Sequence, residues 1–126
     1  MWRVCPLAHI HSNVVFKSEH NATIMQLDAI VHVEGEGISG STAYVVESSY
    51  HSPQLKEVQE LKKKAAMFEL WAKSDAHFES VTKVVAVLAG RLWPIETVDA
   101  AIAANQWRVQ PSAAGYSVLR NLDTAA

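Results

Sequence analysis

The chain has 126 residues, of which 49% are hydrophobic and 19% are charged, with a formal net charge of -2 at pH 7. This predicts one globular domain, residues 1–126, and excludes a general cationic field, so nucleic acid would need a local basic patch or bound metal ions. The single cysteine, Cys5, excludes an internal disulfide. No apolar stretch has membrane-spanning length and the start lacks a signal-peptide pattern, so we expect an intracellular protein with no membrane partner.

Three strands are predicted in the first part of the chain. They cover residues 13–16, about 23–33 and about 42–48, which are rich in β-branched and aromatic side chains. The segments SEHNA and EGEGISGS between them are typical of hairpin turns. We therefore expect three antiparallel neighbours.

A helix is predicted next, with Ser52 as its N-cap and Pro53 at its first helical position. Its apolar residues recur at three- and four-residue steps and define the face that packs on the sheet: Leu55, Val58, Leu61, Ala65, Phe68 and Ala72. Glu60 and Lys64 are expected to form a solvent-facing pair. The lysine block 62–64 is either a solvated surface or a phosphate-contacting patch.

The second half of the chain predicts a central strand, a short helix and two short strands. The apolar run SVTKVVAVLAG should lie parallel to one of the first three strands. Pro94 opens the helix, with one apolar side formed by Ile95, Val98, Ala101 and Ile102. The last strands are expected at about 107–110 and 116–119. The fold class is α/β, with a mixed central sheet of about four to six strands flanked by two helices, in the order β-β-β-α-β-α-β-β.

Two carboxylates interrupt apolar strands: Asp28 in the second strand and Glu47 in the third. Strict alternation places Asp28 on the same face as Ile30 and His32, and Leu27 on the opposite face. If the two strands pair, the carboxylates approach each other, and they repel unless a cation or a proton lies between them. Hard divalent ions such as Mg²⁺ bind through one or two carboxylates plus water and phosphate. The pair is therefore a candidate metal site for phosphodiester hydrolysis.

These patterns resemble the PD-(D/E)XK, or restriction-endonuclease-like, nucleases. LDAIVHV is similar to the region of their second-strand aspartate, and VVESS occupies the place of the (D/E)-X-K motif. More narrowly, TAYVVESSYHSPQLKEV and VVAVLAGRLWPIETVDAAIAANQWRVQPSAAGYSVL resemble the nuclease-like domains of Crinkler and RHS-type effectors. The resemblance implies a restriction-endonuclease-like core and an Mg²⁺- or Mn²⁺-dependent nuclease that acts on DNA or RNA. It also implies delivery to host cells, often to the nucleus or cytoplasm.

The resemblance implies that Asp28 and Glu47 bind the metal, with the Ser48 carbonyl as a further ligand. The sequence departs from the motif at its lysine, because that position is Ser49. A hydroxyl group does not supply the positive charge that positions the attacking water. Candidates for the missing group are a lysine that has moved to the following helix, a lysine on the first strand, or a proton-transfer group just past the third strand: Lys56, Lys63, Lys17 and His51.

A noncatalytic alternative stays open. The helix that usually precedes the first strand is absent or reduced to WRVCPLAHIHS, which, with Ser49, indicates a degenerate module that binds a host or partner protein or nucleic acid. Asp28 and Glu47 would then be strand carboxylates paired to Lys17 or Arg91. A homodimer fits either alternative, because it would shelter an edge strand.

The histidines and tryptophans have structural interpretations as well as functional ones. The spacing of His9 and His11 suits a metal on a strand, but an exposed terminal segment is the favoured reading. His32 is expected to be a satisfied structural residue, or to hydrogen-bond to Asp28. The tryptophans at 71, 93 and 107 are expected to be core or interface anchors, because interleaved basic residues typical of base-stacking platforms are missing.

Overall fold

A computed structural model describes residues 8–17, 23–34, 40–113 and 115–120. The elements follow the predicted order: β1 (Ala8–Lys17), β2 (Thr23–Glu34), β3 (Ser41–Ser48), α1 (Leu55–Ala72), β4 (Val81–Ala89), α2 (Ile95–Ala103), β5 (Trp107–Ser112) and β6 (Gly115–Leu119). Cys5, the predicted turn at 18–22 and most of the second turn, residues 35–39, lie outside the described residues.

The strands form one six-stranded sheet in the order β1-β2-β3-β4-β5-β6. The β1–β2, β2–β3 and β5–β6 pairs are antiparallel, whereas β4 lies parallel to both β3 and β5. The α/β class and the mixed sheet are therefore confirmed. In the described part of the chain, no helix is long and apolar enough to cross a membrane.

Strand β1 begins five residues earlier than predicted, at Ala8 and not at Asn13. Ala8 pairs with Val33, so the residues expected to form an exposed terminal segment are the start of an edge strand. They are paired through the β2 backbone, although most of their side chains are exposed.

Helix α1 begins later than predicted. Gln54 is its N-cap and Leu55 its first residue, so Ser52 and Pro53 precede the helix. Pro53 is fully buried, and its carbonyl accepts a hydrogen bond of 3.0 Å from the Thr97 hydroxyl of α2. Pro53 thus lies outside the first helical turn and links the start of α1 to α2.

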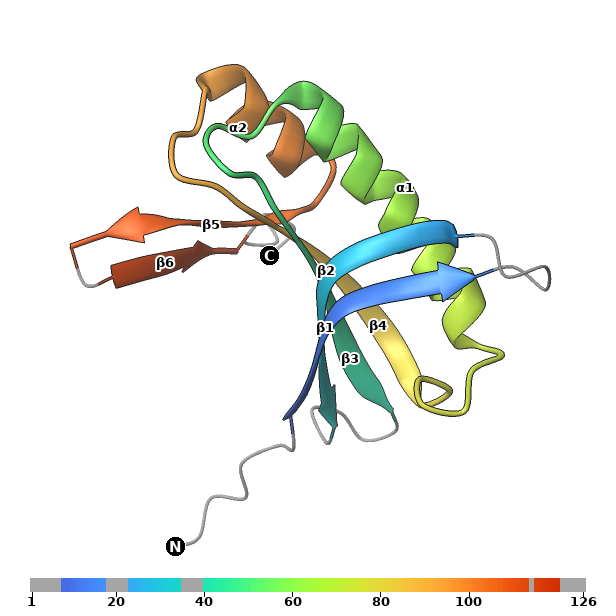
Figure 1. Ribbon diagram of the computed structural model, residues 1–126. Helices are drawn as coiled ribbons and strands as arrows, with labels where there is room; N and C mark the ends of the chain where they lie inside the picture. The colour runs from blue at the N-terminus through green and yellow to red at the C-terminus, as the bar shows by residue number, and fades with distance from the viewer. Residues whose placement is uncertain (1–7, 18–22, 35–39, 114, 121–126) are drawn as a thin grey trace, which may run out of the picture.

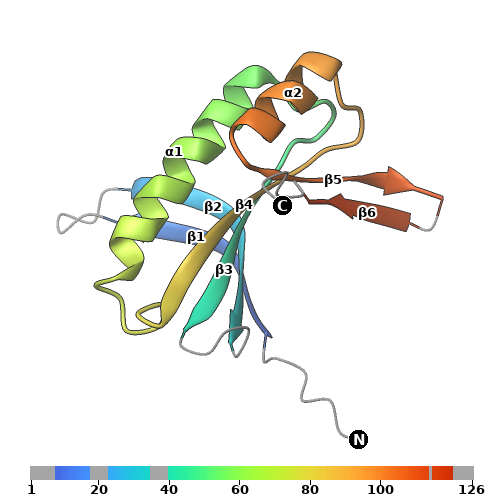
Figure 2. The same cartoon turned by 180° about the vertical axis from the view of Figure 1, so that it is seen from behind.

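Both helices lie over the same face of the sheet (Figures 1 and 2). The core between α1 and the sheet contains fully buried residues from both layers: Val58, Leu61, Phe68, Leu27, Ile30, Ala43 and Val45. Leu55, Ile95 and Ile102 are exposed, against the prediction, and α2 buries Thr97 and Ala101. The buried face of α2 is therefore formed by Thr97 and Ala101, and its largest apolar side chains lie outside this face.

The β1–β2 hairpin is kinked in its middle, as Figure 1 shows. Cα pairing runs to Ser12 and Ala29 and resumes at Val14 and Leu27, and Asn13 between them has a left-handed φ of 50°. Asparagine tolerates this conformation better than most residues do. The kink brings the far half of the hairpin against α1, where the Phe16 and Trp71 rings lie 4.4 Å apart.

The kink also changes which side chains face the core. Leu27 and Ile30 are three residues apart and both are fully buried. Strict alternation therefore fails between them, and the prediction that placed Leu27 on the face opposite Ile30 is wrong.

Candidate carboxylate site

The site lies where β2 leaves β3. Pairing between these strands ends at Ala29 and Val46, one residue short of Asp28 and Glu47. The backbone of Ser48, next along β3, therefore has no β2 ladder partner. A backbone N–H that loses its ladder partner needs another acceptor.

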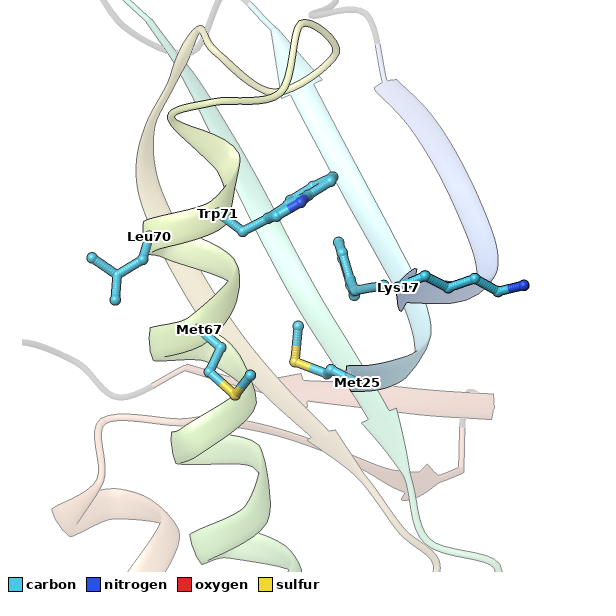
Figure 3. A pocket seen from close by; sticks show the side chains of 6 residues that line it. Lys17, Met25, Met67, Leu70 and Trp71 are labelled. Carbon is cyan, nitrogen blue, oxygen red and sulfur yellow. The ribbon is translucent and has the colours of Figure 1, made fainter. Parts of the chain in front are cut away.

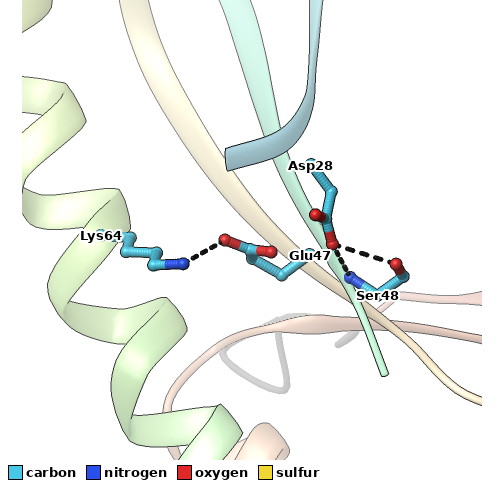
Figure 4. A network of polar contacts seen from close by, with 4 residues as sticks. All are labelled: Asp28, Glu47, Ser48 and Lys64. Atoms are coloured by element: carbon cyan, nitrogen blue, oxygen red, sulfur yellow. Dashed lines mark hydrogen bonds and ion pairs between the residues drawn. The ribbon is translucent and has the colours of Figure 1, made fainter. Parts of the chain in front are cut away.

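Asp28 supplies that acceptor. Its Oδ2 atom accepts a hydrogen bond of 2.8 Å from the Ser48 backbone amide and one of 3.0 Å from the Ser48 hydroxyl (Figure 4). The carboxylate thus closes the open end of the ladder and is held in a fixed position. Asp28 and Glu47 are brought together, as the sequence predicted.

Glu47 points from β3 toward α1, where Lys64 donates to its Oε1 atom at 2.6 Å. The Lys64 and Glu47 side chains are 30% and 16% exposed. In Figure 4, Glu47 lies between the Lys64 amine and the Asp28 carboxyl group. The three side chains thus lie in one row, with Glu47 between the opposite charge of Lys64 and the like charge of Asp28.

The environment moves the pKa values of the two carboxyl groups in opposite directions. Partial burial opposes the charge of Asp28, but hydrogen bonds from Ser48 and Glu47 and the Lys64 charge outweigh it and hold the pKa of Asp28 below its ordinary value. Burial raises the pKa of Glu47; Asp28 adds to this, and the Lys64 hydrogen bond opposes it. Two nearby carboxyl groups with divergent pKa values are suited to different acid–base roles.

A cavity of about 220 Å³ opens beside this pair. Its described lining combines four carboxylates with one lysine and a few other side chains: Asp28, Glu47, Glu57, Glu60, Lys64, Ser48, Leu61 and Leu88. Lys64 is the single cation among these residues. The cavity is polar and acidic, as a cation site requires.

Ser49, at the position of the motif lysine, is bonded to the start of α1. Its hydroxyl donates to Glu57 Oε1 at 3.2 Å, and the same oxygen accepts a hydrogen bond of 3.0 Å from the Gln54 backbone N–H. Glu57 thereby caps the helix N-terminus. Ser49 thus positions α1 relative to β3 and brings no charge to Glu47.

The predicted replacements for the motif lysine do not reach the site. Lys56 is exposed and lies 3.9 Å from Glu60, and Lys63 is exposed. Lys17 lines a separate apolar cavity of about 370 Å³, and Figure 3 shows its side chain running away from α1. The expectation that Asp28 and Glu47 pair with Lys17 or Arg91 is also wrong, because Lys64 fills that role.

The sequence contains a pattern that places Lys64 next to the buried face of α1. It follows Leu61 by three residues and precedes Phe68 by four, so it lies along the edge of the buried face of α1. The expected Glu60–Lys64 pair uses the local i,i+4 rule, which takes no account of Glu47 on the neighbouring strand.

The histidines lie elsewhere. His51 lines a different cavity with Arg91, Leu92 and Pro111, so it is not brought to the carboxylates. His32 is buried, and its Nε2 atom lies 2.6 Å from the Ser41 hydroxyl, which makes it a satisfied structural residue with no bond to Asp28. His9 lies 3.9 Å from Glu34, and the ring of His11 packs 5.3 Å from that of Phe78.

The donor set fits a hard divalent cation. Asp28 and Glu47 lie within hydrogen-bonding reach of each other, and a cation between them would relieve their repulsion. Mg²⁺ and Mn²⁺ accept two carboxylates and complete their shell with water. Within the described residues no third acidic, histidine or cysteine side chain joins the pair in a ligand group.

No protein-family model matches this chain, and no curated protein sequence matches it.

Proposed function

We propose that this domain is a PD-(D/E)XK-like, metal-dependent phosphodiesterase that acts on DNA, with the motif lysine replaced by Lys64 of α1. The observation that supports it is the line Asp28–Glu47–Lys64 at the open end of β3. This arrangement brings Asp28 and Glu47, the two carboxylates of the predicted motif, next to Lys64 from α1, the helix that follows the motif.

The residues have distinct roles in this proposal. Asp28, with its low pKa, stays ionised and is fixed by Ser48. Burial and Asp28 raise the pKa of Glu47, so a cation beside this carboxyl group would stabilise its charged form, as expected of the second metal ligand. Lys64 holds the Glu47 carboxylate in place and provides the positive charge at the position of the attacking water.

A metal ion would complete the site. Mg²⁺ or Mn²⁺ would be held by Asp28 and Glu47, with the Ser48 carbonyl as a further predicted ligand, and it would supply water activation and charge stabilisation on the phosphate.

A noncatalytic module is the second candidate. The observation that favours it is that Asp28 and Glu47 already have protein partners in Ser48 and Lys64. A ladder-end cap and a strand-to-helix ion pair account for both carboxylates without catalysis. In that case the domain would bind a protein partner or nucleic acid.

Cleavage of supercoiled plasmid DNA in Mg²⁺ or Mn²⁺ distinguishes the candidates. We expect nicking by the unchanged protein and losses of at least about 100-fold for Asp28→Asn, Glu47→Gln and Lys64→Gln, since positioned acid–base and electrostatic groups each contribute on that order. Lys63→Gln is the matched control, because it removes the same charge from the adjacent exposed position. Equal nicking by Lys63→Gln and Lys64→Gln would contradict the proposed lysine replacement, and no nicking by the unchanged protein would favour the noncatalytic module.

A further inference from the structure

A second hollow lies beside the carboxylate cavity, at the carboxyl ends of β3 and β4. It has a volume of about 290 Å³ and contains Ser48, Ser49, Tyr50, Ala89, Gly90, Arg91, Val109 and Tyr116 among its lining residues. We call these residues the tyrosine groove. Ser48 also lines the carboxylate cavity, so the two hollows are adjacent.

Backbone hydrogen bonds fix the floor of the tyrosine groove. The Ser49 amide donates to the Ala89 carbonyl at 2.8 Å, and the Gly90 amide donates to the Val109 carbonyl at 3.0 Å. The Arg91 amide donates to the His51 carbonyl at 3.1 Å. Segments from β3, β4 and β5 are thus held together, and the groove exists before any ligand arrives.

Two tyrosines of the groove present their rings to solvent. Tyr50 is 87% exposed and Tyr116 is 75% exposed. The His51 ring packs edge-on against the Tyr50 ring, with 4.4 Å between the ring centroids. Exposed aromatic faces on a rigid floor are suited to stack on planar ligands.

Arg91 brings a positive charge to the same groove. Within the described residues its guanidinium has no ion-pair or hydrogen-bond partner. The described lining also contains no carboxylate that would neutralise it. A guanidinium group with unused donors is suited to bind phosphate oxygens in a two-point contact.

We propose that the tyrosine groove binds single-stranded nucleic acid, with Arg91 on a backbone phosphate and Tyr50 and Tyr116 stacked on bases. Bases can stack on protein rings only when they are unpaired, as they are in a single strand. The choice of a nucleic acid as ligand rests on the proposed function, and the shared residue Ser48 lets one strand run from the groove into the carboxylate cavity.

Fluorescence anisotropy of a labelled oligonucleotide of about twelve nucleotides tests this in EDTA, where no cleavage takes place. We expect Arg91→Gln and Tyr116→Leu to weaken binding about tenfold or more each. Arg91→Gln should also reduce the slope of log affinity against log salt concentration by about 0.7, the value for one phosphate contact on a single strand. Lys73→Gln, which removes the same charge from an exposed position just after α1, should leave affinity unchanged.

Equal affinities of Arg91→Gln and Lys73→Gln would overturn the inference, as would a blunt duplex that competes as well as the single strand. Failure of the proposed function gives a different result. If Glu47→Gln binds the oligonucleotide normally and the unchanged protein cuts no DNA, binding by the groove is supported and the proposed nuclease activity is refuted. If DNA is cut but binding does not depend on Arg91, the groove alone is refuted.

Discussion

Replacing Lys64 by methionine should destabilise the fold in a way that depends on pH. The substitution keeps most of the apolar stem of the side chain and removes the amine that lies 2.6 Å from Glu47 Oε1. Glu47 would then be a mostly buried carboxylate beside Asp28, without the Lys64 cation. The effect on stability therefore reports the ion pair and not a loss of packing volume.

The magnitude follows from burial and charge. A hydrogen bond to a charged group contributes about 1.5–3 kcal/mol, and removing one partner of a fully buried pair costs about 3–5 kcal/mol. These side chains are 30% and 16% exposed, so solvent screening reduces the expected cost to about 1–2 kcal/mol near neutral pH. Because the pKa of Glu47 is already raised, the unpaired carboxyl group can be protonated, and the cost should shrink as pH falls from about 7 to about 5.

Urea unfolding followed by tryptophan fluorescence measures this cost at both pH values. Lys63→Met is the control, because Lys63 is exposed on the same helix. The reasoning is refuted if Lys64→Met loses no more stability than Lys63→Met near neutral pH. A cost that stays constant with pH would show that Glu47 is not the group left unpaired.

Three further predictions test other parts of the structure. Ser49→Lys restores the motif lysine and should recover plasmid nicking in a Lys64→Gln background; a double variant as inactive as Lys64→Gln would contradict this. Burial lowers the pKa of His32, so His32 contributes stability above its unfolded pKa that is lost as pH falls below about 6.5, and His32→Gln should flatten urea-derived stability across this range. An unchanged slope would assign the pH dependence to other groups. A Cβ on Gly90 would overlap the ring of Pro53, so Gly90→Ala should cost about 1–3 kcal/mol in thermal unfolding, and an unchanged melting temperature would refute that contact.

Local patterns predicted the elements and one half of the site. Glu47 lies two residues after the buried Val45, so alternation along β3 predicts that both face α1. The three- and four-residue steps of α1 identified Leu61 and Phe68 as core residues. These features depend on periods that the sequence states directly.

The rest depended on single backbone and tertiary events. Asn13 has a left-handed φ at the kink of the hairpin, and the buried face of β2 changes between Leu27 and Ile30. In the same region Asp28 caps the end of β3 through Ser48. No periodic pattern encodes a change at one residue. Local spacing pairs Lys64 with Glu60. In the structure Lys64 pairs with Glu47, which lies 17 residues away in the sequence, on β3.

Titration of the protein with Mn²⁺ by calorimetry tests most directly whether Asp28 and Glu47 form one cation site. We predict saturable binding by the unchanged protein that both Asp28→Asn and Glu47→Gln abolish, while Lys63→Gln leaves it intact. Binding that survives in both carboxylate variants, or a complete lack of binding by the unchanged protein, would contradict the metal-dependent site and leave the carboxylates as a strand cap and an ion pair.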